Sequence, residues 1–222
     1  MTSPATPATP PLDGSRYPNL VFDYGGVLVD LDRPRCIRRF HALGVTDIDD
    51  LLDPCHQQGV FHGLDEGTVS NETFHDEIRR HSHRDLTGDE IDAAWCTFLH
   101  GIPAYKLEAL LALRQTHRVI LLSNVSDLHW RWTCTHHFSW GGHVPEDYFE
   151  RIYLSYRLKL TKPDLRLFRH VLADSGLRPE ETLFLDDSPT NCAAARTLGI
   201  HTYTPRALED WRPLFGLSQI CH

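Results

Sequence analysis

The sequence predicts an α/β fold in which a parallel sheet is flanked by helices and a small helical domain is inserted after the first strand. Two observations lead to this prediction. Short apolar runs without polar alternation, typical of strands buried on both faces, are separated by single helical patterns. Such an order indicates a parallel sheet with right-handed crossovers. Only the stretch after the first run departs from it, because its periodicity is helical throughout.

The first strand is expected over residues 19–22, where an apolar run ends at Asp23 and two glycines follow. In open α/β sheets, ligands bind outside the carboxyl ends of the strands, so Asp23 occupies a position that favours chemistry. An ordinary strand before an Asp-x-Gly-Gly turn would give the same local pattern. The residues before this strand, 1–16, are rich in Pro, Thr and Ala and are predicted to be a disordered tail.

Residues 33–101 are predicted to form the inserted domain, with about four helices and no strand. Pro34 suits the first turn of a helix that ends before Gly44. Ser70 and Thr87 have the spacing of N-cap residues, and the segment that Thr87 opens forms a capping box. The four helices are expected over residues 34–43 and 47–57, from 71 onward and from 88 onward.

From residue 102 onward, helices and strands are expected to alternate and to complete a core domain of residues 17–32 and 102–222. Gly176 and Gly199 mark the ends of two of its helices. A Trp-rich stretch, residues 127–147, has no clear period. Its tryptophans could be core residues or could cover the edge of a cleft, and we interpret them as core residues: Trp130, Trp132 and Trp140. The core helices are predicted over 103–115, 164–175 and 189–198, and the strands over 118–122, 151–155, 182–185 and 200–203.

Composition excludes several classes of function. The chain has 222 residues and a formal net charge of −8, which argues against a general binder of nucleic acid or of anionic membranes. No apolar run approaches transmembrane length, and the N-terminus lacks the pattern of a secretory signal. The six cysteines are scattered and form no C-x-x-C pair, so we expect a reduced, cytoplasmic protein. The sequence indicates no particular oligomeric state.

Polar residues follow the predicted strands at four points in chain order. Asp23 and Asp187 offer hard oxygen ligands that suit Mg²⁺, and an Asp carboxylate that attacks phosphorus would form an aspartyl phosphate. Ser123 and the start of the helix after it would make a phosphate cradle, and a lysine can pair with a phosphate and a carboxylate. Each residue alone is explained by a helix cap, a loop or a polar turn, but their joint occurrence is not. The full set is Asp23, Ser123, Asn124, Lys162, Asp186 and Asp187.

This set resembles the motifs of the haloacid dehalogenase superfamily, and the resemblance covers residues 19–205. The inserted helical domain stands where that superfamily has its small cap domain, and a Rossmann-like core sheet is implied. Within the superfamily, the chain is most similar to sugar-phosphate phosphatases of the α-D-glucose-1-phosphatase kind, through residues 65–70 and 152–155. The four motifs are Phe22-Asp23-Tyr24-Gly25-Gly26-Val27-Leu28, Leu121-Leu122-Ser123-Asn124, Lys162-Pro163-Asp164 and Phe184-Leu185-Asp186-Asp187.

The resemblance implies a Mg²⁺-dependent phosphatase that acts on a small phosphorylated metabolite, such as a sugar phosphate. Asp23 would be the nucleophile, Ser123 and Asn124 would bind the phosphoryl group, and Lys162 would stabilise charge. The implied metal ligands are Asp23, Asp187, the backbone carbonyl of Gly25 and, through a water, Asp186.

One position departs from the superfamily pattern. Most of its phosphatases carry a second Asp two residues after the nucleophile, which protonates the leaving group and then activates water; here that position is Gly25. General acid–base help is worth about 10²–10⁴-fold in rate. We prefer a working phosphatase, because glucose-1-phosphatase-like relatives tolerate a glycine there. Two explanations are compatible with such a phosphatase. Either the leaving group of its substrate would need little protonation, or a residue of the cap, His62 or Glu66, would bind the substrate and supply the proton.

Two alternatives remain open. True 2-haloacid dehalogenases of the superfamily also lack the second Asp, and a halide leaves without a proton. Those enzymes use no metal, however, whereas the paired Asp186 and Asp187 are typical of a metal site. The other alternative is a catalytically weakened binding protein that kept the fold, for which Gly25 alone would be the sign.

Overall fold

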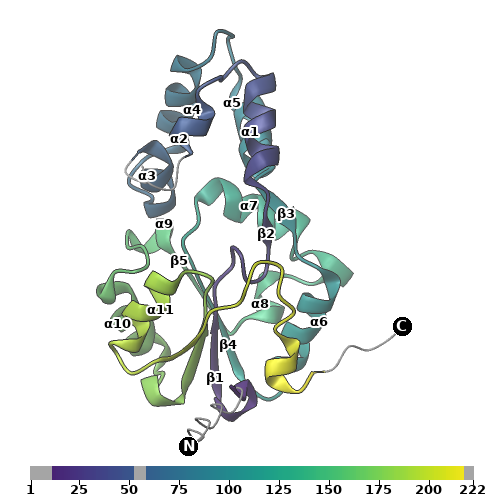
Figure 1. Ribbon diagram of the computed structural model, residues 1–222, viewed down its shortest axis with the longest axis vertical. Helices are drawn as coiled ribbons and strands as arrows, with labels where there is room; N and C mark the ends of the chain where they lie inside the picture. The colour runs from purple at the N-terminus through teal and green to yellow at the C-terminus, as the bar shows by residue number, and fades with distance from the viewer. Residues whose placement is uncertain (1–11, 53–58, 218–222) are drawn as a thin grey trace, which may run out of the picture.

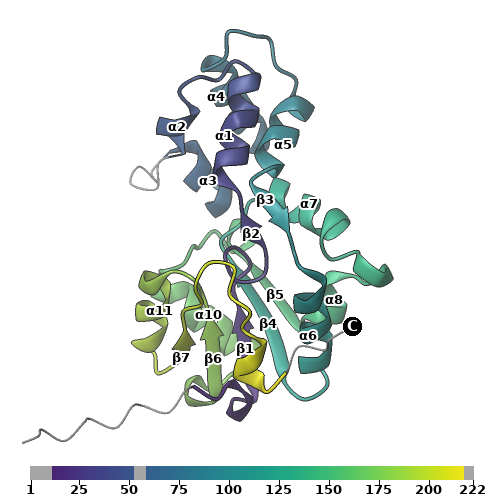
Figure 2. The same cartoon turned by 45° about the vertical axis from the view of Figure 1, so that its right-hand side comes forward.

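The structure is a computed structural model that describes residues 12–52 and 59–217. At its centre is a five-stranded parallel sheet with the strand order β5-β4-β1-β6-β7 (Figures 1 and 2). The predicted fold, a parallel sheet flanked by helices, is thereby confirmed, and each of its predicted strands is present. The strands are β1 (Asn19–Phe22), β4 (Arg118–Ser123), β5 (Arg151–Leu154), β6 (Thr182–Leu185) and β7 (His201–Tyr203).

Strand β1 lies in the middle of the sheet because it can bury both of its faces. Leu20 and Phe22 belong to the apolar cluster on one side, and Val21 belongs to the cluster on the other. Beyond the strand, the backbone N–H of Asp23 still donates to the carbonyl of Leu185, at 2.9 Å. The first carboxylate is therefore held at the carboxyl edge of the sheet, between β4 and β6.

Helices cover both faces of the sheet. Helices α6, α7 and α8 contribute Leu110, Trp130 and Tyr148 to the cluster around Phe22, whereas α10 and α11 pack on the opposite face around Phe184. Figures 1 and 2 show the two groups on either side of the strands. The core helices are α6 (Ala104–Leu113), α7 (Asp127–His136), α8 (Pro145–Tyr148), α9 (Ser155–Leu158), α10 (Leu165–Ser175) and α11 (Pro189–Arg196).

The Trp-rich stretch forms α7, a short 3₁₀ turn (η3, Trp140–Gly142) and α8. Trp130 is buried, and Trp132 is half-buried against the same core cluster. Trp140 is 39% exposed, so its interpretation as a core residue is wrong. The reason is its place in a glycine-containing turn on the surface, where the ring stacks on His143 and stays partly open to solvent.

The segment after β1 forms a helical insert, here meaning α1 to α5, which lies beyond the carboxyl edge of the sheet (Figure 1). It has an apolar cluster of its own, built around Phe40, Phe74 and Ile91. Ser70 and Thr87 cap α4 and α5 as predicted, and Thr87 forms the complete capping box. The helices are α1 (Arg33–Ala42), α2 (Ile48–Leu51), α3 (Val60–Glu66), α4 (Asn71–Arg80) and α5 (Gly88–Cys96).

In the described part of the insert there are thus five helices instead of about four, because the sequence does not predict α3. Its sequence carries Gly63 inside the helix and Gly67 at its end, which hides the helical pattern. Gly63 is needed for packing, since a Cβ there would lie 2.4 Å from Cγ2 of Val69. The helix expected over residues 47–57 is observed over Ile48–Leu51, and its part over 53–58 lies outside the described residues.

Two short strands connect the helical insert to the core. Strands β2 (Asp30–Leu31) and β3 (Leu99–Gly101) form an antiparallel pair that joins the two parts of the molecule (Figure 2). The N–H of Asp32 donates to the carbonyl of Phe98 at 2.8 Å and extends the pairing. The expectation of no strand within residues 33–101 is therefore wrong, because strands this short show no alternation of polar and apolar residues.

The predicted disordered tail, residues 1–16, falls outside the described residues as far as residue 11. The prediction is wrong for the rest, because Gly14–Arg16 forms a 3₁₀ turn capped by Asp13. Gly14 is buried against Phe215, and a Cβ on that glycine would lie 2.6 Å from the ring. The chain is thus fixed to the C-terminal turn η5 (Arg212–Phe215) before the first strand begins.

The cysteines in residues 12–52 and 59–217 are free thiols, and none of them is paired with another. Three are buried, in keeping with the behaviour of cysteine as a small apolar side chain. In the same two ranges, the helices are too short or too polar for any of them to traverse a bilayer. The described cysteines are Cys36, Cys96, Cys134 and Cys192.

Candidate active site

Polar side chains from three neighbouring strands meet at the carboxyl edge of the sheet. Asp23 follows β1, Ser123 ends β4, and Asp186 follows β6, while Lys162 comes from the loop between α9 and α10. Because β4, β1 and β6 are adjacent and parallel, their carboxyl ends lie side by side. The residues that the sequence places at separate strand ends are therefore brought together in one site.

Lys162 is the centre of this site. Its Nζ lies 2.6 Å from Oδ1 of Asp23 and 2.7 Å from Oδ2 of Asp186, and it donates to the carbonyl of Leu122 at 3.1 Å. The side chain is 1% exposed. Burial opposes the charged form, but the two carboxylates outweigh it and raise the pKa of Lys162 above its ordinary value. The lysine is a fixed positive charge between two buried carboxylates.

Asp23 is a buried carboxylate with an unusual acidity. Burial raises its pKa to about 7; the charge of Lys162 opposes this rise, and the charge of Asp186 adds to it. Its Oδ1 also accepts a hydrogen bond from the N–H of Tyr24, at 2.7 Å. A divalent cation beside this carboxylate would favour its ionised form, which is the form that can act as a nucleophile.

Asp186 and Asp187 complete a cluster of three carboxylates with Asp23. Each offers an oxygen, and these oxygens all lie within 4.8 Å of one another. Asp186 is fully buried, and its Oδ1 accepts from the N–H of Ser188 at 2.8 Å and from Nδ2 of Asn191 at 3.0 Å. Asp187 is exposed to solvent. Asp186 is thus held by the protein, whereas Asp187 is open to a ligand.

The donor set of this cluster fits Mg²⁺, which prefers carboxylate oxygens together with water and phosphate oxygens. An independent sign of a bound anion is Ser123, whose Oγ is buried and has no hydrogen-bond partner within the part of the chain that the structure describes. Buried hydroxyls in folded proteins are normally satisfied. This hydroxyl, at the end of β4, is therefore able to form a hydrogen bond with a ligand next to the cluster.

Gly26 allows the close approach of Asp187. It has a φ of +70°, and a Cβ on it would lie 2.2 Å from Oδ2 of Asp187. A glycine is required here both for the left-handed backbone and for the space that the carboxylate occupies. The second glycine of the turn thus sets the position of a candidate metal ligand.

Replacing Gly26 by alanine is expected to weaken Mg²⁺ binding by about 10–100-fold, the usual effect of disturbing the groups that orient a metal ligand. Isothermal titration of the variant with Mg²⁺ measures this. Gly176→Ala is the matched control, because Gly176 has a similar φ of +64° but free space where its Cβ would stand. Equal Mg²⁺ affinity in wild type and Gly26→Ala would contradict the assignment of Asp187.

The side chain of Asn124 has a different partner from the one that the sequence suggests. Its Nδ2 donates to the carbonyl of Lys162 at 2.9 Å, and its Oδ1 accepts from the N–H of the same residue at 2.8 Å. Both polar ends of the amide are therefore used to hold the backbone of the lysine. The side-chain amide is therefore not free to bind a phosphoryl group, and the predicted role of Asn124 would fall to its backbone N–H.

The helix after Ser123 starts later than the sequence suggests. Helix α7 begins at Asp127, and its N-cap is Ser126, whose Oγ accepts from the N–H of His129. The N–H of Val125 donates to Oγ of Ser155 at 2.9 Å. The sequence suggests a helix N-terminus directly after Ser123 that would bind phosphate, but a short extended segment lies there instead. One of its backbone N–H groups, that of Val125, is already bound by a protein side chain.

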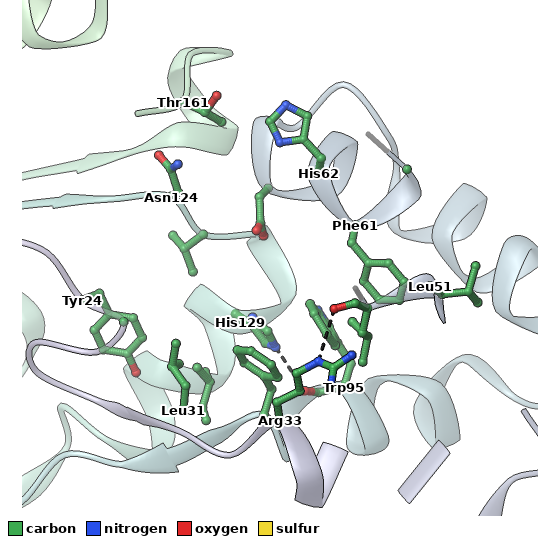
Figure 3. A pocket seen from close by; sticks show the side chains of 17 residues that line it. Tyr24, Leu31, Arg33, Leu51, Phe61, His62, Trp95, Asn124, His129 and Thr161 are labelled. Carbon is green, nitrogen blue, oxygen red and sulfur yellow. Dashed lines mark hydrogen bonds between the residues drawn. The ribbon is translucent and has the colours of Figure 1, made fainter. Parts of the chain in front are cut away.

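A cavity of about 340 Å³ lies between the core and the helical insert. From the core, Tyr24, Gly25 and Asn124 line it, and from the insert, Phe61, His62, Asp65 and Trp95. Figure 3 shows Asn124 and Thr161 on one side of this space and Phe61 and His62, from α3, on the other. Its apolar wall is formed largely by Leu31, Leu51, Leu52, Phe61, Trp95, Phe98 and Leu99.

The two cap residues that the sequence singles out are placed differently. His62 is exposed and lines this cavity. Glu66 does not line it; it lies in a shallow neighbouring groove and accepts a hydrogen bond from Oγ1 of Thr68, at 3.2 Å. The structure therefore brings His62, but not Glu66, to the space beside Gly25.

Sequence reasoning does not identify three polar residues of the cavity wall. Arg33 donates to the carbonyls of Leu52 and Asp49, at 3.3 and 2.9 Å, and His129 is buried against Trp95. Thr161 could be identified from the sequence, because it directly precedes the lysine of the third motif. Arg33 and His129 carry no such signal, since Arg33 directly precedes a predicted helix and His129 stands in the Trp-rich stretch, which has no clear period.

The chain matches known proteins along most of its length. Residues 17–199 match the family model of haloacid dehalogenase-like hydrolases. A D-ribitol-5-phosphate phosphatase from Bacteroides thetaiotaomicron is 40% identical over 194 residues, which is 87% of this chain and 94% of that protein.

Solved structures give the same picture. A HAD family enzyme from Bacteroides thetaiotaomicron, solved in complex with magnesium and inorganic phosphate, is 45% identical with a TM-score of 0.86. That comparison covers 90% of this chain and 99% of the other. A predicted HAD-like family hydrolase from Porphyromonas gingivalis is 39% identical with a TM-score of 0.84 and covers 90% and 97% of the two chains.

Proposed function

Because this chain belongs to the haloacid dehalogenase-like hydrolase family, we propose that it is a phosphatase that hydrolyses a small phosphomonoester through an aspartyl phosphate on Asp23. One observation carries this proposal: Asp23 and Lys162 form a buried ion pair at the end of β1, and at the end of the neighbouring strand β4 the buried hydroxyl of Ser123 has no hydrogen-bond partner within residues 12–52 and 59–217. The similarity to a D-ribitol-5-phosphate phosphatase supports a sugar phosphate or sugar-alcohol phosphate as the substrate class.

Different residues of the site would bind the phosphoryl group, compensate its charge and hold the lysine in position. The hydroxyl of Ser123 donates to a phosphoryl oxygen and so gains the partner it lacks, and the N–H of Asn124 donates to the same group. Lys162 offsets the negative charge that gathers around phosphorus, because it is fixed beside Asp23. The amide of Asn124 keeps the lysine backbone in place.

The site also fits Mg²⁺. Asp23 and Asp187 would hold the ion together with the carbonyl of Gly25, and Asp186 would contribute through a water. When bound, the ion supplies positive charge to the phosphoryl oxygens and orients them for in-line attack. The HAD family enzyme solved with magnesium and inorganic phosphate supports this assignment.

Hydrolysis takes two steps. A carboxylate oxygen of Asp23 forms a bond to phosphorus as the bond from phosphorus to the leaving-group oxygen breaks. Water then attacks the aspartyl phosphate, releases inorganic phosphate and restores the carboxylate. Since phosphoryl transfer has a loose transition state, positioning and charge compensation carry most of the rate enhancement.

A screen of phosphate release from sugar phosphates, sugar-alcohol phosphates, nucleotides and acyl phosphates tests this proposal. We expect turnover of at least one sugar or sugar-alcohol phosphate with Mg²⁺ and its loss in excess EDTA, because the carboxylate cluster then repels the substrate. Activity restored by added Mg²⁺ is the control.

Two other results would contradict the proposal. Chloride release from 2-chloropropionate in the presence of EDTA would instead indicate a dehalogenase. Absence of turnover on every substrate, together with failure to form an adduct with beryllofluoride and Mg²⁺, would indicate a binding protein.

A further inference from the structure

The missing side chain at Gly25 leaves the leaving-group oxygen without an obvious proton donor on the core side. An alkoxide is a poor leaving group in water, and general acid help of this kind is worth about 10²–10⁴-fold in rate. The backbone at Gly25 would tolerate a side chain, since the nearest atoms to a Cβ there would be those of the Leu31 side chain, at 3.4 Å or more. The glycine therefore does not result from a steric limit, and the facing wall of the cavity is the place to look for the acid.

Asp65 stands on that facing wall. It belongs to α3 and lines the same cavity as Gly25 and Asn124. Its Oδ1 is buried and has no hydrogen-bond partner among residues 12–52 and 59–217. A buried carboxylate oxygen without a partner is costly, and folded proteins normally satisfy such atoms. An unsatisfied carboxylate oxygen on a residue that lines a cavity indicates a group that binds there.

The core holds Asp65 in position through its backbone. Its carbonyl accepts a hydrogen bond from Oγ of Ser155, at 2.5 Å, and Ser155 also binds the N–H of Val125. Val125 directly follows the Ser123-Asn124 motif. One hydroxyl thus connects the helix that carries Asp65 to the segment that binds the phosphoryl group, so the carboxyl group keeps a fixed place relative to it.

The protonation state of Asp65 suits an acid at neutral pH. Burial raises its pKa to about 7, and a hydrogen bond from the backbone of Ser126 opposes the rise. An acid with a pKa near the working pH is the most effective proton donor. Ionisable groups of the cavity wall and of the α9 region that packs on α3 are Tyr24, Arg33, His62, His129, Tyr156, Arg157 and Lys159. Helix α4 also packs on α3, and its ionisable groups are Glu72, His75, Asp76, Glu77, Arg79 and Arg80.

The buried alternatives in the cavity have other roles. Nε2 of His129 is within 3.1 Å of the carbonyl of Trp95, and burial lowers its pKa to about 4, so it carries no acidic proton at pH 7. The hydroxyl of Tyr24 is bound to Thr133 and to His137, each at 2.6 Å, and burial raises its pKa. Neither group is available to a leaving group.

The two cap residues favoured by the sequence are less well placed than Asp65. His62 is exposed at the cavity wall, where solvent reaches it. Glu66 faces the neighbouring groove and is bound by Thr68. Among the carboxyl groups of the helical insert within the described ranges, Asp65 alone lines the cavity.

We propose that Asp65 is the general acid and base of this site, supplied by the helical insert in place of the core residue that Gly25 lacks. The inference rests on the proposed phosphatase function. In the first step, the Asp65 carboxyl group gives its proton to the leaving-group oxygen as the P–O bond breaks and the Asp23–phosphorus bond forms, so that an alcohol leaves. In the second, the Asp65 carboxylate takes a proton from the water that attacks the aspartyl phosphate. Inorganic phosphate is released, and both residues return to their starting states.

Asp65→Asn is the main test, with D-ribitol 5-phosphate and p-nitrophenyl phosphate as probes. For the sugar-alcohol phosphate, kcat is expected to fall about 10²–10⁴-fold. Nitrophenolate leaves without a proton, so p-nitrophenyl phosphate should still give a rapid burst of nitrophenol, equal to the enzyme present, followed by slow turnover. The burst arises because the aspartyl phosphate forms normally but loses the base that activates water.

The pH profile gives a second readout that a merely structural role would not move. In wild type, kcat/KM for D-ribitol 5-phosphate should fall as pH rises through about 7, because Asp65 loses the proton it must donate. This fall in kcat/KM, the basic limb of the pH profile, should be absent when p-nitrophenyl phosphate is the substrate. It should also be absent from the Asp65→Asn variant. Asp89→Asn is the matched control for the loss of an insert carboxylate, because Asp89 is exposed in α5 and does not line the cavity.

A rescue variant separates proton transfer from damage to the fold. Adding Gly25→Asp to Asp65→Asn places a carboxyl group on the core side, where a Cβ has space, and should recover part of the lost kcat. Unchanged kcat on D-ribitol 5-phosphate in Asp65→Asn, or loss of the basic limb in His62→Ala instead, would overturn the inference. Absence of Mg²⁺-dependent hydrolysis of both probes by wild type would overturn the phosphatase proposal itself, which is a distinct result.

Discussion

Replacement of Asp23 by asparagine is expected to abolish hydrolysis of every phosphomonoester that the wild type accepts, with a fall in kcat of about 10⁴-fold or more. The amide has no oxygen that can form a stable acyl phosphate, so the two-step route is closed. The fold should be retained, since asparagine has the same shape and its oxygen can still accept from the N–H of Tyr24. Lys162 keeps one carboxylate partner, Asp186, at 2.7 Å.

Intact-protein mass spectrometry and phosphate release measure this prediction together. Wild type should form an adduct with beryllofluoride and Mg²⁺, whereas Asp23→Asn should form none. Asp85→Asn is the matched control, because it removes an exposed carboxylate that does not line the cavity. Turnover retained by Asp23→Asn would show that another group attacks phosphorus.

Replacement of Lys162 by methionine is expected to give the largest loss of stability, about 3–5 kcal/mol in the free energy of unfolding. This is the usual effect of removing one partner from a buried ion pair. The variant would leave Asp23 and Asp186 buried together without the cation that lies 2.6 and 2.7 Å from them. Activity should be lost as well, since the charge beside phosphorus disappears.

Urea denaturation in the absence of Mg²⁺ measures the change. Adding Asp23→Asn to Lys162→Met should return part of the stability, because one of the two uncompensated charges is then removed. Arg169→Met is the control: it removes a positive charge from the exposed face of α10 and should change stability by no more than about 0.5 kcal/mol. Equal stability of Lys162→Met and wild type would contradict the description of the ion pair.

Much of this fold follows from the sequence because the three central strands are buried on both faces. A run such as Val119–Leu122 is continuously apolar, and such runs locate β1, β4 and β6, whereas the edge strands β5 and β7 are more polar and partly exposed. Since parallel strands align their carboxyl ends, the order of the motifs is enough to predict that Asp23, Ser123 and Asp186 meet, whereas Lys162 comes from the loop after α9, which the strand pattern does not place. That prediction needs no knowledge of side-chain conformation.

Other parts depend on tertiary contacts that leave little trace in the sequence. Asn124 can serve a ligand or a loop equally well, and only the position of the Lys162 backbone decides between them. Asp65 and Glu66 are neighbours of the same chemical type on α3, and the rotation of that helix decides which one lines the cavity. The helix itself is obscured by Gly63, whose role is close packing against Val69.

The antiparallel pair β2–β3 has a consequence for how readily the helical insert can change in size. The pairing of Asp30 with Gly101 and of Leu31 with Leu99 keeps the two ends of the insert next to each other. For a loop with fixed ends, closure entropy grows only with the logarithm of its length, so doubling the insert would add about 0.6 kcal/mol. Leu31 and Leu99 also line the cavity. The helical insert above the cavity could therefore change in length at a small cost in the free energy of folding, while the carboxylates at the edge of the sheet keep their places.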